Sequence, residues 1–398
     1  MNTRFAPDAA IELDGQPIPA VMRASVTDVE VQGGFDGADR VDLVLTNDHL
    51  RWTDHPGLRV GRGLRVSLGY APDPLQPVFD GEITGVGATF PQNAAPAVTV
   101  SAQDRRHRLQ DGRKVRWFGI PIPTVGNFPL PDIATAGLVT LENLLLPIFD
   151  PVGAALAVLI GGIEAVSTIS DPGSAQKFIR KQANESDYEF LRKIAAENGW
   201  DMYVDQTGPT GGHALRFQSS LDHLDADVTL AWGRDLLDFA PRISTVGEVL
   251  SVVGFVWVPE IKTTFNIQLG WDWDRQSLTI RIYPGVALLG GGGSSNLIKE
   301  PLTPASAARK LVAELIPKLN KRLTASGSCL GDPAIRVGGV LRIEGVGEQF
   351  GGHYRVVSVQ HRLDSGGYRT RFDLRKEIWF GSIPAVDQGA VPIRVASL

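Results

Sequence analysis

The sequence of 398 residues has few of the side chains from which disulfides and metal centres are built. It contains one cysteine, Cys329, and only seven histidines. A single cysteine excludes an internal disulfide and a zinc site made of cysteine ligands. Folding in a reducing compartment such as the cytoplasm suits this composition.

A strong excess of positive charge is also missing. The chain has 39 Lys and Arg residues against 44 Asp and Glu residues, for a formal net charge of −5. The basic residues form no block, whereas proteins that bind nucleic acid usually carry a basic patch. We therefore expect no nucleic-acid partner.

The sequence lacks an uninterrupted apolar run long enough to cross a bilayer. The nearest candidate, residues 144–163, is broken by Pro147, Asp150 and Pro151, whereas a transmembrane helix needs about 20 apolar residues. The N-terminal segment Met1–Asp8 has no apolar core of the kind found in a signal peptide. We expect no stable membrane insertion, and residues 144–163 should be buried in the chain or against a partner.

Motifs for familiar catalytic chemistry are missing as well. The sequence has no Gly-x-Ser-x-Gly, no His-Glu-x-x-His and no Gly-x-x-x-x-Gly-Lys. Asp272 and Asp274 lack the further ligands of a calcium loop. His353 and His361 have no cysteine or carboxylate at ligand spacing, and Cys329 has no evident histidine partner. We expect no catalytic residue, no metal and no cofactor.

Short β-strand patterns are abundant. Alternating segments separated by glycine, proline and asparagine fill residues 1–112 and recur after residue 236. Asp14–Gly15 predicts a tight hairpin turn, and Val21–Val31 predicts a strand. This spacing is typical of a sandwich or barrel, so the fold class is β-rich α+β.

One central helix is marked at both ends. Ser186 and Glu189 form a capping box, apolar side chains follow at helical spacing, and Gly199 supplies a left-handed stop. The preceding segment, Ser174–Ala183, also predicts a helix. A further helix is expected near residues 303–322.

The amino-acid sequence of this central helix resembles a signature of the phage late control gene D family. These are hub proteins of phage tails and contractile injection systems, and they also form the hub part of valine-glycine-repeat spike proteins. Other motifs follow the family order: Val78-Phe-Asp-Gly-Glu-Ile83, Thr99-Val-Ser-Ala-Gln-Asp104, Gly352-His-Tyr-Arg-Val-Val-Ser-Val-Gln-His361 and Tyr368-Arg-Thr-Arg-Phe372.

The resemblance implies two tail-tube-like β-barrel domains with a helical central segment. The expected organisation is a first barrel over 1–112, an apolar Pro/Gly-broken insertion over 113–173, a helix and hairpin module over 174–235, a second barrel over 236–380 and a tail over 381–398. The insertion departs from the family pattern.

The resemblance also implies a structural function without enzymatic activity. Three chains would form a pseudo-sixfold ring that joins the sixfold inner tube to the threefold spike. The expected partners are two further copies, a separate spike or tip protein, the inner tube protein and other baseplate components, assembled in the bacterial cytoplasm. The sequence does not distinguish a phage from another contractile system.

Apolar residues in two segments are candidates for docking a partner, with burial in the chain or a loose tail as the alternatives left open. They are Trp379, Phe380, Ile383, Leu145, Ile148 and Phe149.

Two other functions fit the sequence less well. A cell-wall-degrading tail enzyme would need a carboxylate pair in the insertion 113–173, which is shorter than the roughly 100 residues of an independent domain. A carbohydrate-binding β-sandwich would need an aromatic platform, whereas the tryptophans are scattered.

Overall fold

The structure is a computed structural model, and it describes a subset of the chain. The described residues are 6–118, 180–207, 212, 214–220, 223–244, 251–258, 263–272, 277–284, 295–302, 311 and 314–378. The chain divides into two compact units. Unit 1 comprises residues 1–107, 200–248 and 317–392, and unit 2 comprises residues 108–199, 249–316 and 393–398.

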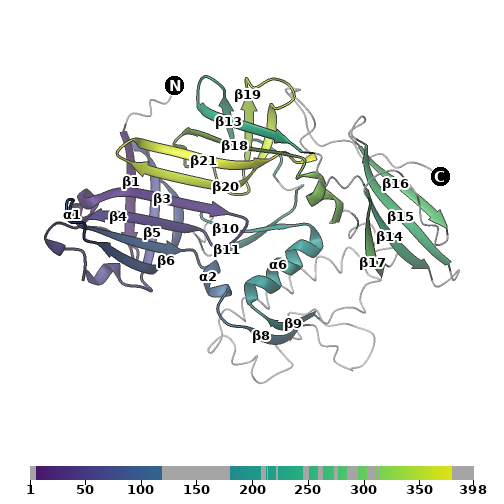
Figure 1. Ribbon diagram of the computed structural model, residues 1–398, viewed down its shortest axis with the longest axis horizontal. Coiled ribbons are helices and arrows are strands. Elements are labelled where there is room, and N and C mark those ends of the chain that lie inside the picture. The colour runs from purple at the N-terminus through teal and green to yellow at the C-terminus, as the bar shows by residue number, and fades with distance from the viewer. Residues whose placement is uncertain are drawn as a thin grey trace. The chain divides into compact units, whose positions relative to one another are not determined.

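Unit 1 is built on one 13-stranded sheet (Figure 1). Its first group of strands is β1 (Ala6–Leu13), β2 (Gln16–Pro17), β3 (Val26–Gly34), β4 (Arg40–Thr46), β5 (Gly63–Ala71), β6 (Gln76–Thr89) and β7 (Ala97–Gln103). Its second group is β12 (Val228–Ala231), β13 (Leu236–Ile243), β18 (Leu323–Leu330), β19 (Val340–Glu344), β20 (Gly352–Asp364) and β21 (Gly367–Arg375). We call these groups the first lobe and the second lobe.

The two lobes repeat one strand order. The first runs β3-β4-β7-β6-β5-β1, and the second runs β13-β18-β21-β20, with β19 on β20 and β12 on β19. Each strand therefore has a counterpart at the same place: β3 and β13, β4 and β18, β7 and β21, β6 and β20, β5 and β19. The last pair differs, because β1 is antiparallel to β5 whereas β12 is parallel to β19.

The repeat extends to the β-bulges. The β3–β4 register shifts between Val26 and Asp28, and the β13–β18 register shifts between Leu236 and Asp238. The register of β6 against β7 shifts after Ile83, and that of β20 against β21 shifts after Val356. Bulges fix register and twist, so the two lobes share detailed geometry as well as topology.

A tight turn before β5 and β19 is repeated with its sequence. Leu58-Arg-Val-Gly61 precedes β5 and Ile335-Arg-Val-Gly338 precedes β19. Gly61 and Gly338 have φ of +88° and +80°, a conformation that favours glycine. Their amides donate to the carbonyls of Ile83 (2.8 Å) and Val356 (3.0 Å), the residues at the matched bulges.

Each lobe has its own hydrophobic core. The first gathers inward-facing residues of β3–β7, including Val41, Val66, Phe79 and Val100, and the second gathers residues of β18–β21, including Cys329, Tyr354 and Val356. The lobes join where β20 pairs with β3, from Ser358 opposite Gly34 to Leu363 opposite Val29 (Figure 1). Tyr368 of the second lobe packs into the first core across this joint.

The N-terminal region confirms one local prediction and corrects another. Asp14 and Gly15 have φ of 49° and 76°, as a tight hairpin turn between β1 and β2 requires. The strand predicted over Val21–Val31 is wrong in its first part, because α1 (Ala20–Ser25) precedes β3. Met22 of α1 is buried in the first core, so tertiary packing overrides the strand propensity of this segment.

Shorter elements complete unit 1. They are the 3₁₀ turns Asp48–Leu50 and Pro56–Leu58 and the hairpin of β10 (Asp201–Asp205) and β11 (Ala214–Gln218). Helix α2 (Arg106–Leu109) begins in unit 1 and spans the boundary between residues 107 and 108.

Unit 2 contains the central helix, two paired strands and a separate sheet. Its elements are β8 (Lys114–Phe118), β9 (Arg180–Glu185), α6 (Asp187–Asn198) and the four-stranded sheet of β14 (Ser251–Val258), β15 (Thr263–Asp272), β16 (Ser277–Pro284) and β17 (Ser295–Leu302).

The predicted caps of α6 are present. The Ser186 hydroxyl accepts from the Glu189 amide (3.1 Å), the Glu189 carboxylate accepts from the Ser186 amide (2.8 Å), and Gly199 is left-handed. The helix predicted over Ser174–Ala183 is wrong for its described end, where β9 pairs with β8. Pairing between segments distant in sequence decides this conformation.

The described part of the chain is thus β-rich with few helices, as the sequence predicts. Among the described strands, no chain of strand pairs closes into a barrel. In the expected region 303–322, residues 314–319 are helical, and Leu311, Leu315 and Leu319 of the predicted apolar stripe are buried.

Candidate functional site

The described residues hold no evident catalytic or metal centre. No group of three His, Cys, Asp or Glu side chains among them is placed to hold a metal ion. Within the same residues, no helix is both long enough and apolar enough to cross a bilayer. Cys329 is fully buried in the second core. Asp272 is the last residue of β15, and Asp274 lies outside the described residues.

The two histidines singled out from the sequence lie on β20. His361 is buried; its ring nitrogens contact the Tyr368 hydroxyl (2.9 Å) and the Ile335 carbonyl (3.1 Å). Burial lowers the pKa of His361 to about 4, so the ring is neutral at pH 7. His353 is partly buried, and desolvation lowers its pKa as well. Both rings are therefore neutral at pH 7.

The docking candidates Trp379, Phe380, Ile383, Leu145, Ile148 and Phe149 all lie outside the described residues. The features of unit 1 that bear on assembly are instead a buried polar network between segments and a set of exposed apolar side chains. Sequence reasoning did not find either.

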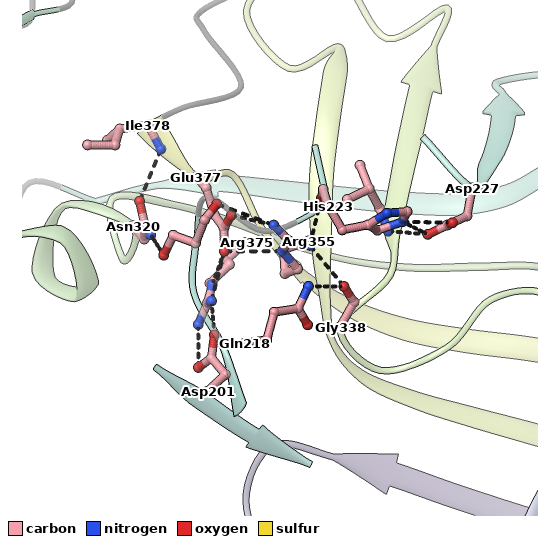
Figure 2. Close-up of polar contacts among 12 residues, drawn as sticks. Asp201, Gln218, His223, Asp227, Asn320, Gly338, Arg355, Arg375, Glu377 and Ile378 are labelled. Atoms are coloured by element: carbon pink, nitrogen blue, oxygen red, sulfur yellow. Dashed lines mark hydrogen bonds and ion pairs between the residues drawn. The ribbon is translucent and has the colours of Figure 1, made fainter. Parts of the chain in front are cut away.

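Arg355 is the centre of the polar network (Figure 2). Its side chain is fully buried beside the equally buried Glu377, whose carboxylate accepts from Arg355 Nη2 (3.0 Å). Arg355 Nη1 also donates to the carbonyls of Gly338 (2.9 Å) and His223 (3.0 Å). A guanidinium that binds one carboxylate and several carbonyls satisfies the polar groups that burial would otherwise leave unpaired.

The network fixes the chain on both sides of β21. Arg375 forms an ion pair with Asp201 of β10 and donates to Glu377 from Nη2 (2.8 Å). Beyond Glu377, the Ile378 amide donates to Asn320 Oδ1 (3.0 Å). The network therefore holds together four segments of the chain, as Figure 2 shows: those around residues 201, 320, 355 and 377.

The β10–β11 hairpin contacts both lobes. Gln218 donates to the Gly338 carbonyl of the second lobe (3.1 Å). On the first lobe, Gln206 Nε2 donates to Asp39 (3.1 Å), and Gln206 Oε1 accepts from the Asp80 amide (2.9 Å). The hairpin thus reinforces the joint made by β20 and β3.

Asp39 belongs to a second buried ionic cluster, in the first lobe. Arg106 is fully buried and pairs with Asp39 and with Asp104, at 2.8 Å for Nε to Asp104. One guanidinium therefore forms ion pairs with two buried carboxylates. Burial is the main cause that raises the pKa of Asp39 to about 6; Arg106 opposes this shift, and Asp104 adds to it. The cluster ties the β3–β4 turn to α2.

A cavity of about 560 Å³ lies between the lobes and the hairpin. Its lining includes Asp205, paired with Arg216 at 2.7 Å, and Asp227, paired with His223 at 2.8 Å. Asp227 Oδ2 also accepts from the Val340 amide at the start of β19 (2.8 Å). The carboxylates thus have structural partners, and Asp227 links its segment to the second lobe.

Large apolar side chains are exposed in both lobes. In the first lobe, Val86 of β6 and Phe90 just after it are 40% and 63% exposed, and in the second lobe Leu237 and Ile243 of β13 are 46% and 38% exposed. Contiguous exposed apolar surface is typical of protein contact surfaces.

Comparison with known proteins bears on the fold. Neither a protein-family model nor a curated protein matches the sequence. Among solved structures, the chain is similar to a tail protein from Neisseria meningitidis MC58, with 12% identity over 95% of this chain and 99% of that one and a TM-score of 0.56. It is also similar to the 43 kDa tail protein of prophage MuSo2 from Shewanella oneidensis, with 12% identity over 93% and 98% of the two chains and a TM-score of 0.57.

A third similar structure comes from a secretion system. The E. coli c3393 protein, a type VI secretion component described as similar to the T4 bacteriophage tail proteins gp27 and gp5, has 11% identity over 96% of this chain and 80% of its own, with a TM-score of 0.54. At such identities the likeness establishes the fold alone. The chain thus has the β-rich fold of phage tail and type VI secretion proteins, consistent with the resemblance of its motifs to the late control gene D hub family.

Proposed function

We propose that the protein is the structural hub of a contractile tail or injection system, with no enzymatic activity of its own. The observation that carries this proposal is the repeat within unit 1: one strand order, with matched bulges and a matched glycine turn, occurs twice in one chain. Each lobe corresponds to one of the two tube-like barrels implied by the sequence resemblance.

A chain with two similar lobes is suited to join parts of different symmetry. Three such chains in a ring present six similar lobes, although the ring has only threefold symmetry. One face of the ring can then contact a sixfold tube, and the other can contact a threefold spike. Identical chains that associate through one repeated head-to-tail contact form a closed ring when the rotation between neighbours closes.

The partners of this hub are two further copies of the chain, the inner tube protein, a separate spike or tip protein and other baseplate components. Residues Trp379, Phe380 and Ile383 of the C-terminal tail and Leu145, Ile148 and Phe149 of the insertion are proposed docking elements. The proposed tube-like domains are those expected from the sequence, over 1–112 and 236–380; the second range also contains β14–β17, which belong to unit 2.

The native mass of the purified protein tests the proposal. Light scattering, with and without the neighbouring spike protein, should give three times the chain mass of 42.9 kDa in at least one sample. A single-chain mass in both samples would contradict a self-assembling ring.

A further inference from the structure

The joint between the two lobes provides a template for contacts between chains. Within one chain, the C-terminal half of β20 pairs with β3, in six residue pairs from Ser358–Gly34 to Leu363–Val29. The counterpart of β20 in the first lobe is β6, and the counterpart of β3 in the second lobe is β13. If the same joint forms again, β6 of one chain pairs with β13 of another.

The required edge of β6 is open in the described structure. Before the bulge, β6 pairs with β5 as far as Glu82 opposite Gly63. After the bulge, residues 85–89 pair with β7 on one side, and no described strand pairs with the other side. The same division holds in β20, which pairs with β19 up to Arg355 and with β3 from Ser358.

The required edge of β13 is open as well. This strand pairs with β18 along one side, from Leu236 to Ile243. Along the other side, no described strand forms a ladder with it; the contact recorded there is a single bridge between Trp232 and Leu236. Strand edges left open in a stable protein are sites where a further strand can add.

We propose that residues 86–89 of β6 and the segment that follows it pair in antiparallel fashion with β13 of a second copy of this chain. The inference rests on the proposed ring and specifies its contact. It is a head-to-tail joint, so each chain uses β6 on one neighbour and β13 on the other, and the ring alternates joints within chains and joints between chains.

The repeat also gives the register. The matched bulges place Gly85 at the position of Ser358 and Asp238 at the position of Asp28. Transferring the β20–β3 register then sets Val86 opposite Ile243, and Thr89 opposite Ala240. Both members of the first pair are exposed apolar residues, at 40% and 38%, and the joint would remove them from water.

One residue of β13 limits the ladder. Pro241 has no amide hydrogen, so the joint loses at most one hydrogen bond at that position. Proline is tolerated on edge strands, and it discourages indiscriminate pairing of this edge. The apolar contact between Val86 and Ile243 therefore carries much of the specificity.

Cysteine pairs at four exposed positions test both the contact and its register. The matched double variants are Val86→Cys with Ile243→Cys and Thr89→Cys with Ala240→Cys. The mismatched controls exchange the partners: Val86→Cys with Ala240→Cys and Thr89→Cys with Ile243→Cys. Directly opposed residues have Cα atoms about 4.5–5.5 Å apart, within disulfide range. A three-residue offset adds about 10 Å along the strand and prevents the bond.

After mild oxidation, non-reducing gels should show the matched variants as covalent trimers and the mismatched variants as single chains. Light scattering of the same samples separates the two proposals. A native trimer in which neither matched pair forms a disulfide would overturn this contact and leave the proposed ring intact. Equal disulfide formation in matched and mismatched variants would overturn the register. Single chains by light scattering in every sample would refute the ring and this contact together.

Discussion

The buried pair of Arg355 and Glu377 allows a direct test of the polar network. Glu377→Gln keeps the size of the side chain but removes the negative charge beside a guanidinium that is fully buried. Arg355 retains its carbonyl partners at Gly338 and His223, and Arg375 retains Asp201. Breaking one side of a buried ion pair costs about 3–5 kcal/mol, because it leaves an uncompensated charge in the interior.

Urea unfolding monitored by circular dichroism measures this cost. Urea is suitable because it is uncharged and does not screen the ion pairs. Glu377→Gln should lower the unfolding midpoint of the transition that reports unit 1, with an unchanged slope. Asp235→Asn is the matched control, because it makes the same chemical change in the solvent-exposed pair with Arg234, where the cost is about 0–1 kcal/mol. Equal shifts for the two variants would refute the assignment of a structural role to the buried pair.

Three further results are expected. Ser186→Ala removes the N-cap of α6 and should cost about 1 kcal/mol, whereas Lys193→Ala on the exposed side of the same helix should change the unfolding midpoint little; equal effects would contradict the capping role. The pKa of Asp39 is raised to about 6 from 3.8, so the native state holds this proton more tightly than the unfolded state and the contribution of Asp39 falls as pH rises from about 4 to 6. Asp39→Asn should therefore gain stability relative to the native sequence over that interval, and a constant difference in urea midpoints would contradict the raised pKa. Val86→Lys and Ile243→Lys should each reduce the trimer fraction in light scattering, whereas Val86→Glu combined with Ile243→Lys should restore it; failure of the opposite charges to restore trimers would argue against direct contact.

Features encoded by adjacent residues could be predicted from the sequence. The ends of α6 follow from Ser186, Glu189 and Gly199, and the first hairpin follows from Asp14 and Gly15. In each case, the residues that determine the conformation lie within a few positions of one another. The conformation therefore needs no information from the rest of the chain.

Features decided by distant contacts could not be predicted. Residues 180–183 of β9 fall in the helix predicted over Ser174–Ala183 because their own side chains permit a helix, and the pairing of β9 with β8 decides otherwise. Arg355 lies on a β-strand, where its burial is not apparent, and its carbonyl partner His223 lies 132 positions away.

The lobe repeat left one visible trace in the sequence. Leu58-Arg-Val-Gly61 and Ile335-Arg-Val-Gly338 align without a gap, and Leu64-Arg-Val66 and Leu341-Arg-Ile343 follow at the same spacing. A match of so few residues is too short to identify by itself. The shared strand order gives it meaning.

The β20–β3 joint has a consequence for how a ring of these chains would fail under load. This joint lies inside one polypeptide, so if it opens, its two strands stay tethered and meet again at a high effective concentration. A joint between chains has no such tether. In a ring of three chains, three of the six joints are therefore self-repairing, and damage should accumulate at the other three.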